Sequence, residues 1–261
     1  STDDLMAGAS TNDGAPSGDG APGSDGASAD ALALADAAPI DGGNVADATD
    51  DGATTPFCKR ATHAFCEDFD DPSFVLPGRW QVGMKAGGTV TADSTTYSSA
   101  PRAGNFSLPS TAAESAATLY IGTNITVSRG VVSFDAKVSG PPNDNYNLFD
   151  IELPAATGSA TYDLNMLVTP TDLRYFEQSG SLFTEWPIRN GVPSGWHHYA
   201  IAFDLINHTS SVSLDGNSGT ANPLSTGFVP GKLGLGVGIG YARASTGPTT
   251  IWVDNVTLDV P

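Results

Sequence analysis

The run Asn147–Leu153 (N-L-F-D-I-E-L) places two carboxylates, Asp150 and Glu152, two residues apart. Successive side chains of a strand point to opposite faces, so both carboxylates would lie on one face of a strand. Paired carboxylates can cleave a glycosidic bond, and the retaining mechanism needs them about 5–5.5 Å apart. Neighbours on one strand face are about 6.6–7 Å apart, so the pair does not by itself supply that geometry. The alternatives are carboxylates that hydrogen-bond sugar hydroxyls and carboxylates that contact only solvent.

Further residues nearby suit a sugar-binding surface. Trp186 lies beside Pro187 in a polar segment, and we expect it to be exposed as an aromatic platform for a sugar ring. Asn165 and Arg174 add hydrogen-bonding groups. The predicted ligand-binding residues are therefore Trp186, Asp150, Glu152, Asn165 and Arg174.

The only two cysteines are Cys58 and Cys66. An even count in a chain that we expect to be exported favours a disulfide between them. Closing so short a segment would stabilise the fold by about 2–3 kcal/mol. A metal pair and two free thiols are the alternatives, although His63 alone does not complete a zinc site.

Composition divides the chain into two predicted parts. Residues 1–56 contain 11 aspartates and no Lys, Arg or aromatic residue. Such a segment cannot bury enough apolar area to fold, so we expect a disordered, extended spacer. The chain begins at Ser1, and this Asp/Ala/Gly-rich tail resembles the spacer of a bacterial surface lipoprotein, which implies a lipidated cysteine before Ser1. Residues 57–261 have the size of one large β domain.

The formal net charge of −18 argues against partners that are themselves negatively charged. Nucleic acid and anionic membrane surfaces need basic patches, so neither is an expected partner. An acidic chain is compatible with calcium and with neutral sugars. No apolar stretch approaches the roughly 18 residues of a transmembrane helix, and no transmembrane segment is predicted.

After Pro56 the sequence consists of short alternating runs separated by Gly, Pro, Asn and Ser. This pattern predicts an all-β sandwich of two packed antiparallel sheets with about 12–14 strands. Within Leu233–Tyr241, apolar residues alternate with glycines 234, 236, 238 and 240. That glycine face is either a groove floor along which a polymer lies or a surface covered by a loop or a large side chain.

Two runs carry a family resemblance: Gly195–Asp204 (G-W-H-H-Y-A-I-A-F-D) and Ser211–Gly216 (S-V-S-L-D-G). They resemble a strand pair of laminin-G-like modules, which belong to the concanavalin A-like lectin/glucanase superfamily. The resemblance implies a jelly-roll sandwich in which His197 and His198 are part of a strand signature. It leaves the function open, because this fold carries lectins, adhesion modules, glycoside hydrolases and polysaccharide lyases.

The resemblance also indicates which catalytic motifs an enzyme of this fold would carry. Family-16 glycoside hydrolases carry E-x-D-x-E on one strand, and here the nucleophile position is Leu148. Lyases of the fold use a Tyr/His pair with Arg and Gln, and the isolated Arg174, Tyr175 and Gln178 do not match their motifs. We therefore predict no catalytic residue and favour a protein that is not an enzyme.

A calcium site is a further implication of the resemblance. Related carbohydrate-binding modules bring D-F-(D/E) and W-x-D-N-V segments together around Ca²⁺, and Asp68–Asp70 and Trp252–Val256 match them. The implied ligands are Asp68, Asp70 and Asp254, whose oxygens suit Ca²⁺. Asp254 lies on an apolar strand face, where a carboxylate is costly unless it is paired or bound to metal. The alternative is that Asp254 accepts hydrogen bonds from backbone amides at a chain crossing.

The sequence as a whole predicts a secreted or surface-tethered monomer, located outside the cell or at its surface. Its expected activity is non-catalytic binding of a glycan or another cell-surface ligand. The alternatives are a carbohydrate-active enzyme of the same fold and a purely structural adhesion module.

Overall fold

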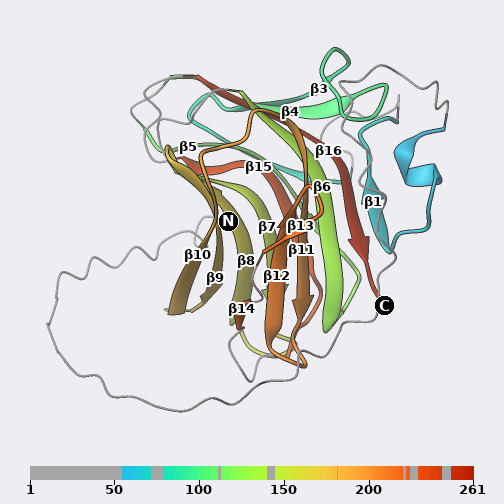
Figure 1. Cartoon of the computed structure of the whole chain (residues 1–261), viewed down its shortest axis with the longest axis vertical. Helices are drawn as coiled ribbons and strands as arrows, with labels where there is room; N and C mark the ends of the chain where they lie inside the picture. The colour runs from blue at the N-terminus through green and yellow to red at the C-terminus, as the bar shows by residue number, and fades with distance from the viewer. Residues whose placement is uncertain are drawn as a thin grey trace, which may run out of the picture. The chain divides into compact units, whose positions relative to one another are not determined.

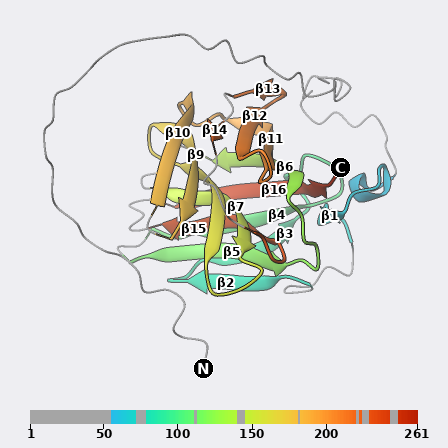
Figure 2. The same ribbon diagram turned by 90° about the horizontal axis from the view of Figure 1, so that it is seen from below.

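The computed structural model describes residues 55–71, 79–110, 113–139, 145–180, 182–219, 222–223, 229–242 and 248–261. These residues form two antiparallel sheets that pack against each other around one apolar core (Figures 1 and 2). The predicted all-β sandwich is confirmed. Residues 1–54, which hold nearly all of the predicted spacer, lie outside the described residues.

One sheet has nine strands in the order β13-β12-β11-β6-β16-β4-β3, with β1 beside β16 and β14 beside β12. A 3-10 helix, η1 (Phe57–Lys59), precedes it. Its strands are β1 (Phe65–Glu67), β3 (Thr89–Asp93), β4 (Ala103–Leu108), β6 (Arg129–Ser139), β11 (Gly195–Asp204), β12 (Thr209–Leu214), β13 (Asn217–Ser218), β14 (Asn222–Pro223) and β16 (Thr249–Asp259).

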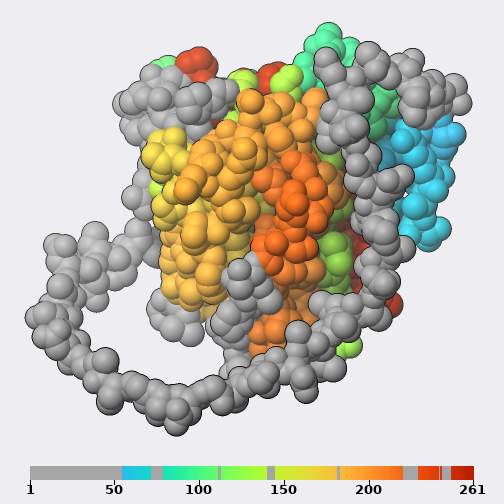
Figure 3. Space-filling model, viewed as in Figure 1, coloured from blue at the N-terminus to red at the C-terminus, as the bar shows by residue number. Residues whose placement is uncertain are grey.

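The other sheet has seven strands in the order β10-β9-β8-β7-β15-β5-β2. They are β2 (Gln81–Lys85), β5 (Ser115–Gly122), β7 (Tyr146–Pro154), β8 (Thr161–Val168), β9 (Asp172–Ser179), β10 (Leu182–Asn190) and β15 (Gly234–Ala242). The described residues thus contain sixteen strands, more than the sequence predicts. Two of them, β13 and β14, have two residues each, too few for an alternating pattern. Parts of β9–β10 and of β11–β12 lie at the surface (Figure 3).

The run Gly195–Asp204, which carries the family resemblance, forms β11 with the predicted bounds. Tyr199, Ile201 and Phe203 are buried, as expected for its apolar face. Phe134 of β6 stacks on Tyr199 at 5.2 Å and on Phe149 of β7 at 4.3 Å between ring centroids. This stack joins the two sheets, and each such aromatic pair contributes about 0.5–1.5 kcal/mol beyond its buried area.

The beginning and end of the domain lie together. Strand β1 pairs with β16, so that Cys66 lies opposite Thr257. A disulfide joins Cys58 to Cys66, which confirms the predicted pairing. It holds η1 against β1 at this edge. Within the described residues, no helix is long and apolar enough to cross a membrane.

Candidate functional site

The face of the seven-stranded sheet that points away from the core, here called the outer face, carries most of the predicted ligand-binding residues. In β7 the buried Ile151 alternates with Asp150 and Glu152, which therefore lie on the outer face. Asp150 pairs across the sheet with Asn165 of β8, and Glu152 pairs with Asp163. Directly opposite positions on one face bring Cβ atoms to about 4.5–5.5 Å. We call Asp150, Glu152 and Asp163 the outer-face carboxylate cluster.

A bulge in β7 decides which residue precedes Asp150 on this face. The pairing with β8 shifts between Asn147 and Phe149, and both Leu148 and Phe149 are buried in the core. Asn147 consequently takes the outer-face position before Asp150, and its Nδ2 donates to Asn165 Oδ1 at 3.3 Å. The position at which a family-16 hydrolase has its nucleophile is thus apolar and also turned away from the outer face.

The surroundings of Asp150 and Asp163 disfavour the ionised forms of these two carboxyl groups. Oδ1 of Asp150 is shielded from solvent and has no hydrogen-bond partner in the described part of the chain. Burial raises the pKa of the Asp150 carboxyl well above its usual range, the charges of Asp163 and Glu152 raise it further, and a hydrogen bond with Asn165 lowers it. Burial, and then the charge of Glu152, raise the pKa of Asp163 to about 6. Burial and the neighbouring charges disfavour the ionised forms of Asp150 and Asp163, so both would be stabilised by a further hydrogen-bond donor or a positive charge.

Tyr120 of β5 covers part of the glycine face of β15. A Cβ added at Gly234 would lie 2.2 Å from the Tyr120 hydroxyl oxygen. The pKa of Tyr120 is raised by burial and then by its hydrogen bond with Glu152. A Cβ at Gly236 would approach Asp150 Cβ at 3.3 Å, and one at Gly240 would approach Asn147 Cβ at 3.5 Å. A large side chain, that of Tyr120, therefore covers the glycine face at Gly234. At Gly236 and Gly240 the absence of a Cβ leaves room for the side chains of Asp150 and Asn147.

The aromatic side chain exposed on this face is Phe183 rather than Trp186. Phe183 of β10 lies opposite Gln178 of β9, which lies opposite Asp163. Its side chain is 55% exposed and packs on Phe176 with ring centroids 5.0 Å apart. Phe183 therefore ends a row of outer-face side chains that runs through Gln178 and Asp163 to Glu152.

Trp186 does not join that row. It pairs with Tyr175, stacks on the Tyr175 ring at 5.7 Å and packs against the core. The structure thus places Trp186 on the inner side of β10, opposite to the other four predicted residues. The alternation of β10 explains this placement, because Phe183 and Glu185 take the outer positions.

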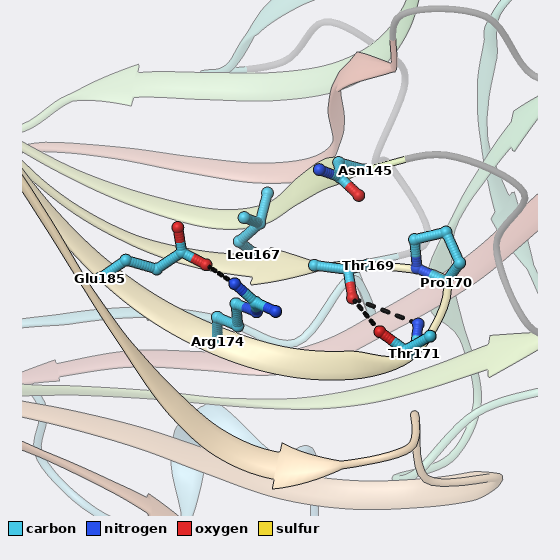
Figure 4. A pocket seen from close by; sticks show the side chains of 7 residues that line it. All are labelled: Asn145, Leu167, Thr169, Pro170, Thr171, Arg174 and Glu185. Carbon is cyan, nitrogen blue, oxygen red and sulfur yellow. Dashed lines mark hydrogen bonds and ion pairs between the residues drawn. The ribbon is translucent and has the colours of Figure 1, made fainter. Parts of the chain in front are cut away.

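Arg174 lies near the start of β9, between the buried Leu173 and Tyr175, and is therefore on the outer face. Figure 4 shows it beside Glu185. Its Nε and Nη2 donate to Asp172 at 2.7 and 2.8 Å, and its Nη1 donates to Glu185. These hydrogen bonds hold the pKa of the guanidinium above its usual value. A hollow of about 280 Å³ opens beside it, lined by Asn145, Leu167, Thr169, Pro170, Thr171, Arg174 and Glu185. Arg174 is thus paired with two acidic residues, Asp172 and Glu185.

Asp254, the central residue of the predicted calcium site, is fully buried. Its Oδ2 accepts hydrogen bonds from the backbone N–H groups of Ser98 and Ser99 at 3.0 and 2.8 Å, and its Oδ1 accepts one from Asn255 N–H at 2.9 Å. This is the capping of backbone amides at a chain crossing that the sequence left as the alternative to metal.

Asp68 and Asp70 also accept backbone hydrogen bonds. Asp68 Oδ2 accepts from Cys58 N–H at 2.9 Å, and Asp70 Oδ1 accepts from Arg102 N–H at 3.1 Å. Asp70 Oδ2 is shielded and has no partner within the described ranges. Among those residues, no three His, Cys, Asp or Glu side chains form a group that could hold a metal ion. Calcium binding stays a prediction. Of the three predicted ligands, only Asp70 has an oxygen, Oδ2, without a hydrogen-bond partner among the described residues.

No family model matches the chain, and no curated protein matches it. Solved structures resemble it over most of its length. An endo-β-1,4-glucuronan lyase from the fungus Trichoderma reesei has a TM-score of 0.60 at 15% identity, covering 77% of this chain and 96% of that chain. A cellulose-induced protein has a TM-score of 0.55 at 16% identity, covering 74% and 96%. The receptor binding domain of botulinum neurotoxin D has a TM-score of 0.52 at 11% identity, covering 76% and 48%. The domain has the concanavalin A-like lectin/glucanase fold.

Identities this low establish the concanavalin A-like fold alone, so the site is argued from the residues of this chain. Sequence reasoning missed Tyr120, Asp163 and Phe183 on its outer face. Asp163 had a usable signal, since Thr161–Val168 alternates and puts Asp163 beside Asn165 on the polar side. The signals for Tyr120 and Phe183 depend on knowing which strands are neighbours, which the sequence does not give.

Proposed function

We propose that this protein binds a glycan through the outer face of its seven-stranded sheet, without catalysis. The observation that carries the proposal is the exposed Phe183 at the end of a row of hydrogen-bonding side chains. A sugar ring presents an apolar face that stacks on an aromatic ring and a rim of hydroxyl groups that needs donors and acceptors. Phe183 supplies the first, and Gln178, Asp163 and Glu152 supply the second.

The structural neighbours support the same class of ligand. One is named for its action on glucuronan and one for its induction by cellulose. The disulfide is typical of proteins in oxidising compartments, which is where such ligands are found. We extend the proposal to a laminin-G-like module that is held at a cell surface by the Asp-rich segment and a lipid anchor before Ser1.

Affinity electrophoresis through gels that contain neutral, cationic or anionic polysaccharides tests the binding. We expect retardation by at least one polymer. Phe183→Ala should weaken it about three- to tenfold, which corresponds to the loss of one aromatic stacking contact. Ile206→Ala, which removes an equally exposed apolar side chain from a turn of the other sheet, is the matched control. Unretarded migration in every gel, or equal retardation of the Phe183 and wild-type proteins, would contradict the proposal.

A second candidate is hydrolysis of a glycosidic bond by Glu152 and Asp163. The observation in its favour is the cross-strand pairing of these two carboxylates, with the pKa of Asp163 at about 6. A carboxyl group with a raised pKa can act as a general acid near neutral pH. New reducing ends released from a polymer by the wild-type protein, and lost in Glu152→Gln, would support this candidate and replace the binding proposal.

A further inference from the structure

Among the described residues, no basic side chain forms an ion pair with a member of the outer-face carboxylate cluster. Asp150 and Glu152 on β7 and Asp163 on β8 occupy adjoining positions of two paired strands. The raised pKa values of Asp150 and Asp163 both include repulsion by neighbouring carboxylates. Carboxylates held this close together favour a positively charged ligand over a neutral one, and a neutral ligand over a negatively charged one.

The basic residues in the described strands of this face do not supply that charge. Arg174 is held by Asp172 and Glu185, and Lys85 of β2 pairs with Glu114 at 2.7 Å. Both cations are thus already paired with other acidic groups. A uronate carboxylate arriving at the cluster would meet like charge, and neither of these two cations is free to neutralise it.

A second feature of the cluster is an acceptor without a donor. The shielded Asp150 Oδ1 lacks a hydrogen-bond partner within the described chain, and a buried acceptor without a donor costs about 1–3 kcal/mol. A metal ion is the less suitable partner, because the described residues contain no group of three side chains arranged to hold one. An ammonium group brings both a positive charge and three N–H donors.

We propose that the outer face selects glycans that carry free amino groups, of the polyglucosamine type, and rejects polyuronates. This inference rests on the proposed glycan-binding function and names its ligand class. A sugar ring stacked on Phe183 would extend along the row of Gln178, Asp163 and Glu152. Its ammonium group, or that of the next residue, would reach the carboxylates of β7 and β8.

Isothermal titration with three oligosaccharides of equal length tests the selectivity near neutral pH: a glucosamine oligomer, a β-1,4-glucose oligomer and a glucuronic acid oligomer. We expect affinity to fall in that order. Glu152→Gln and Asp163→Asn should each weaken binding of the glucosamine oligomer about tenfold and change binding of the glucose oligomer less than about twofold. Asp259→Asn, which removes an equal charge from an exposed residue at the end of β16, should change neither.

The outcomes separate this inference from the function on which it rests. If none of the three oligomers binds, or if Phe183→Ala has no effect on any of them, glycan binding by this face fails. If the glucuronic acid oligomer binds as tightly as the glucosamine oligomer, or binds only when calcium is added, glycan binding stands and the selectivity is overturned. Thermal unfolding of each variant checks that it is folded. Removing a repelling charge should leave Asp163→Asn at least as stable as the wild type.

Discussion

Two groups of three carboxylates lie in this sandwich, and their surroundings differ. The terminal carboxylate cluster consists of Asp70, Asp135 and Asp254. Burial raises the pKa of Asp254, and the three residues lie close enough together for the charges of Asp135 and Asp70 to raise it further. Asp254 is capped by three backbone N–H groups. The outer-face carboxylate cluster has fewer donors. Each cluster has one oxygen without a partner among the described residues, Asp150 Oδ1 in the outer-face cluster and Asp70 Oδ2 in the terminal cluster. Buried carboxylates with donors hold a chain together, whereas those without donors are available to a ligand.

Asp135, unlike Asp70, has hydrogen-bond partners on both of its carboxylate oxygens. Its Oδ1 lies 2.8 Å from His198 Nδ1, and its Oδ2 accepts from Ser98 Oγ at 2.8 Å and from Asn255 Nδ2 at 2.7 Å. The hydrogen bond with Asp135 also raises the pKa of His198. His198, which the sequence placed in a strand signature, therefore has a structural role in linking β11 to this cluster.

Truncation of Asp254 gives the largest effect we expect. Asp254→Ala leaves the N–H groups of Ser98, Ser99 and Asn255 without their acceptor. Unsatisfied buried donors cost about 1–3 kcal/mol each, so the free energy of unfolding should fall by about 3–5 kcal/mol. Urea denaturation measures it. A loss below about 1 kcal/mol would show that Asp254 does not hold the crossing.

Removal of the disulfide should have the next largest effect. The double variant Cys58→Ser, Cys66→Ser should lose about 2–3 kcal/mol of unfolding free energy, because the open segment regains conformational freedom in the unfolded chain. Cys58 N–H also donates to Asp68, so the terminal region should become the first to exchange its amide hydrogens. Protection of these amides that matches the wild type would contradict the proposed role.

Calcium binding at the terminal cluster should give a smaller effect. With Asp70 Oδ2 as the uncommitted ligand, Ca²⁺ at about ten times its Kd would add about 1.4 kcal/mol of stability, or about 3–6 °C in Tm. Chelation should reverse the gain, and Asp70→Asn should abolish it. Identical melting curves with Ca²⁺ and with chelator, in protein shown to be free of metal, would remove calcium from this site.

The smallest effect concerns Asp163, whose folded pKa of about 6 lies above its ordinary value of 3.8. The folded state binds this proton more tightly than the unfolded state, so the contribution of Asp163 to stability falls as pH rises from about 4 to about 7. Asp163→Asn should therefore stabilise the protein near pH 7.5 by about 1 kcal/mol, allowing for solvent screening, and lose this gain near pH 4. Chemical denaturation at the two pH values measures it. A gain that is equal at both would show that the pKa of Asp163 is not raised.

Much of the fold follows from local sequence patterns. The alternation in Gly195–Asp204 predicts β11, the paired cysteines predict the disulfide, and Asp150, Glu152 and Asn165 are predicted to serve one site. These features depend on short-range periodicity, which a single sequence displays directly.

Features that depend on register could not be predicted in this way. The bulge at Leu148 changes which side chain precedes Asp150 on the outer face. The face of Trp186 depends on where β10 begins and on its partner Tyr175. A shift of one residue in a strand exchanges its two faces, so errors of this kind are confined to the site and leave the fold class correct.

Carbon-13 chemical shifts of the Asp and Glu carboxyl groups, followed by NMR while a glucosamine oligomer is added, test the central claim most directly. We expect the carboxyl resonances of Asp150, Glu152 and Asp163 to shift in a saturable way, and those of Asp135 and Asp254 to stay in place. The claim would be contradicted if the resonances of the terminal cluster shifted while those of the outer-face cluster did not.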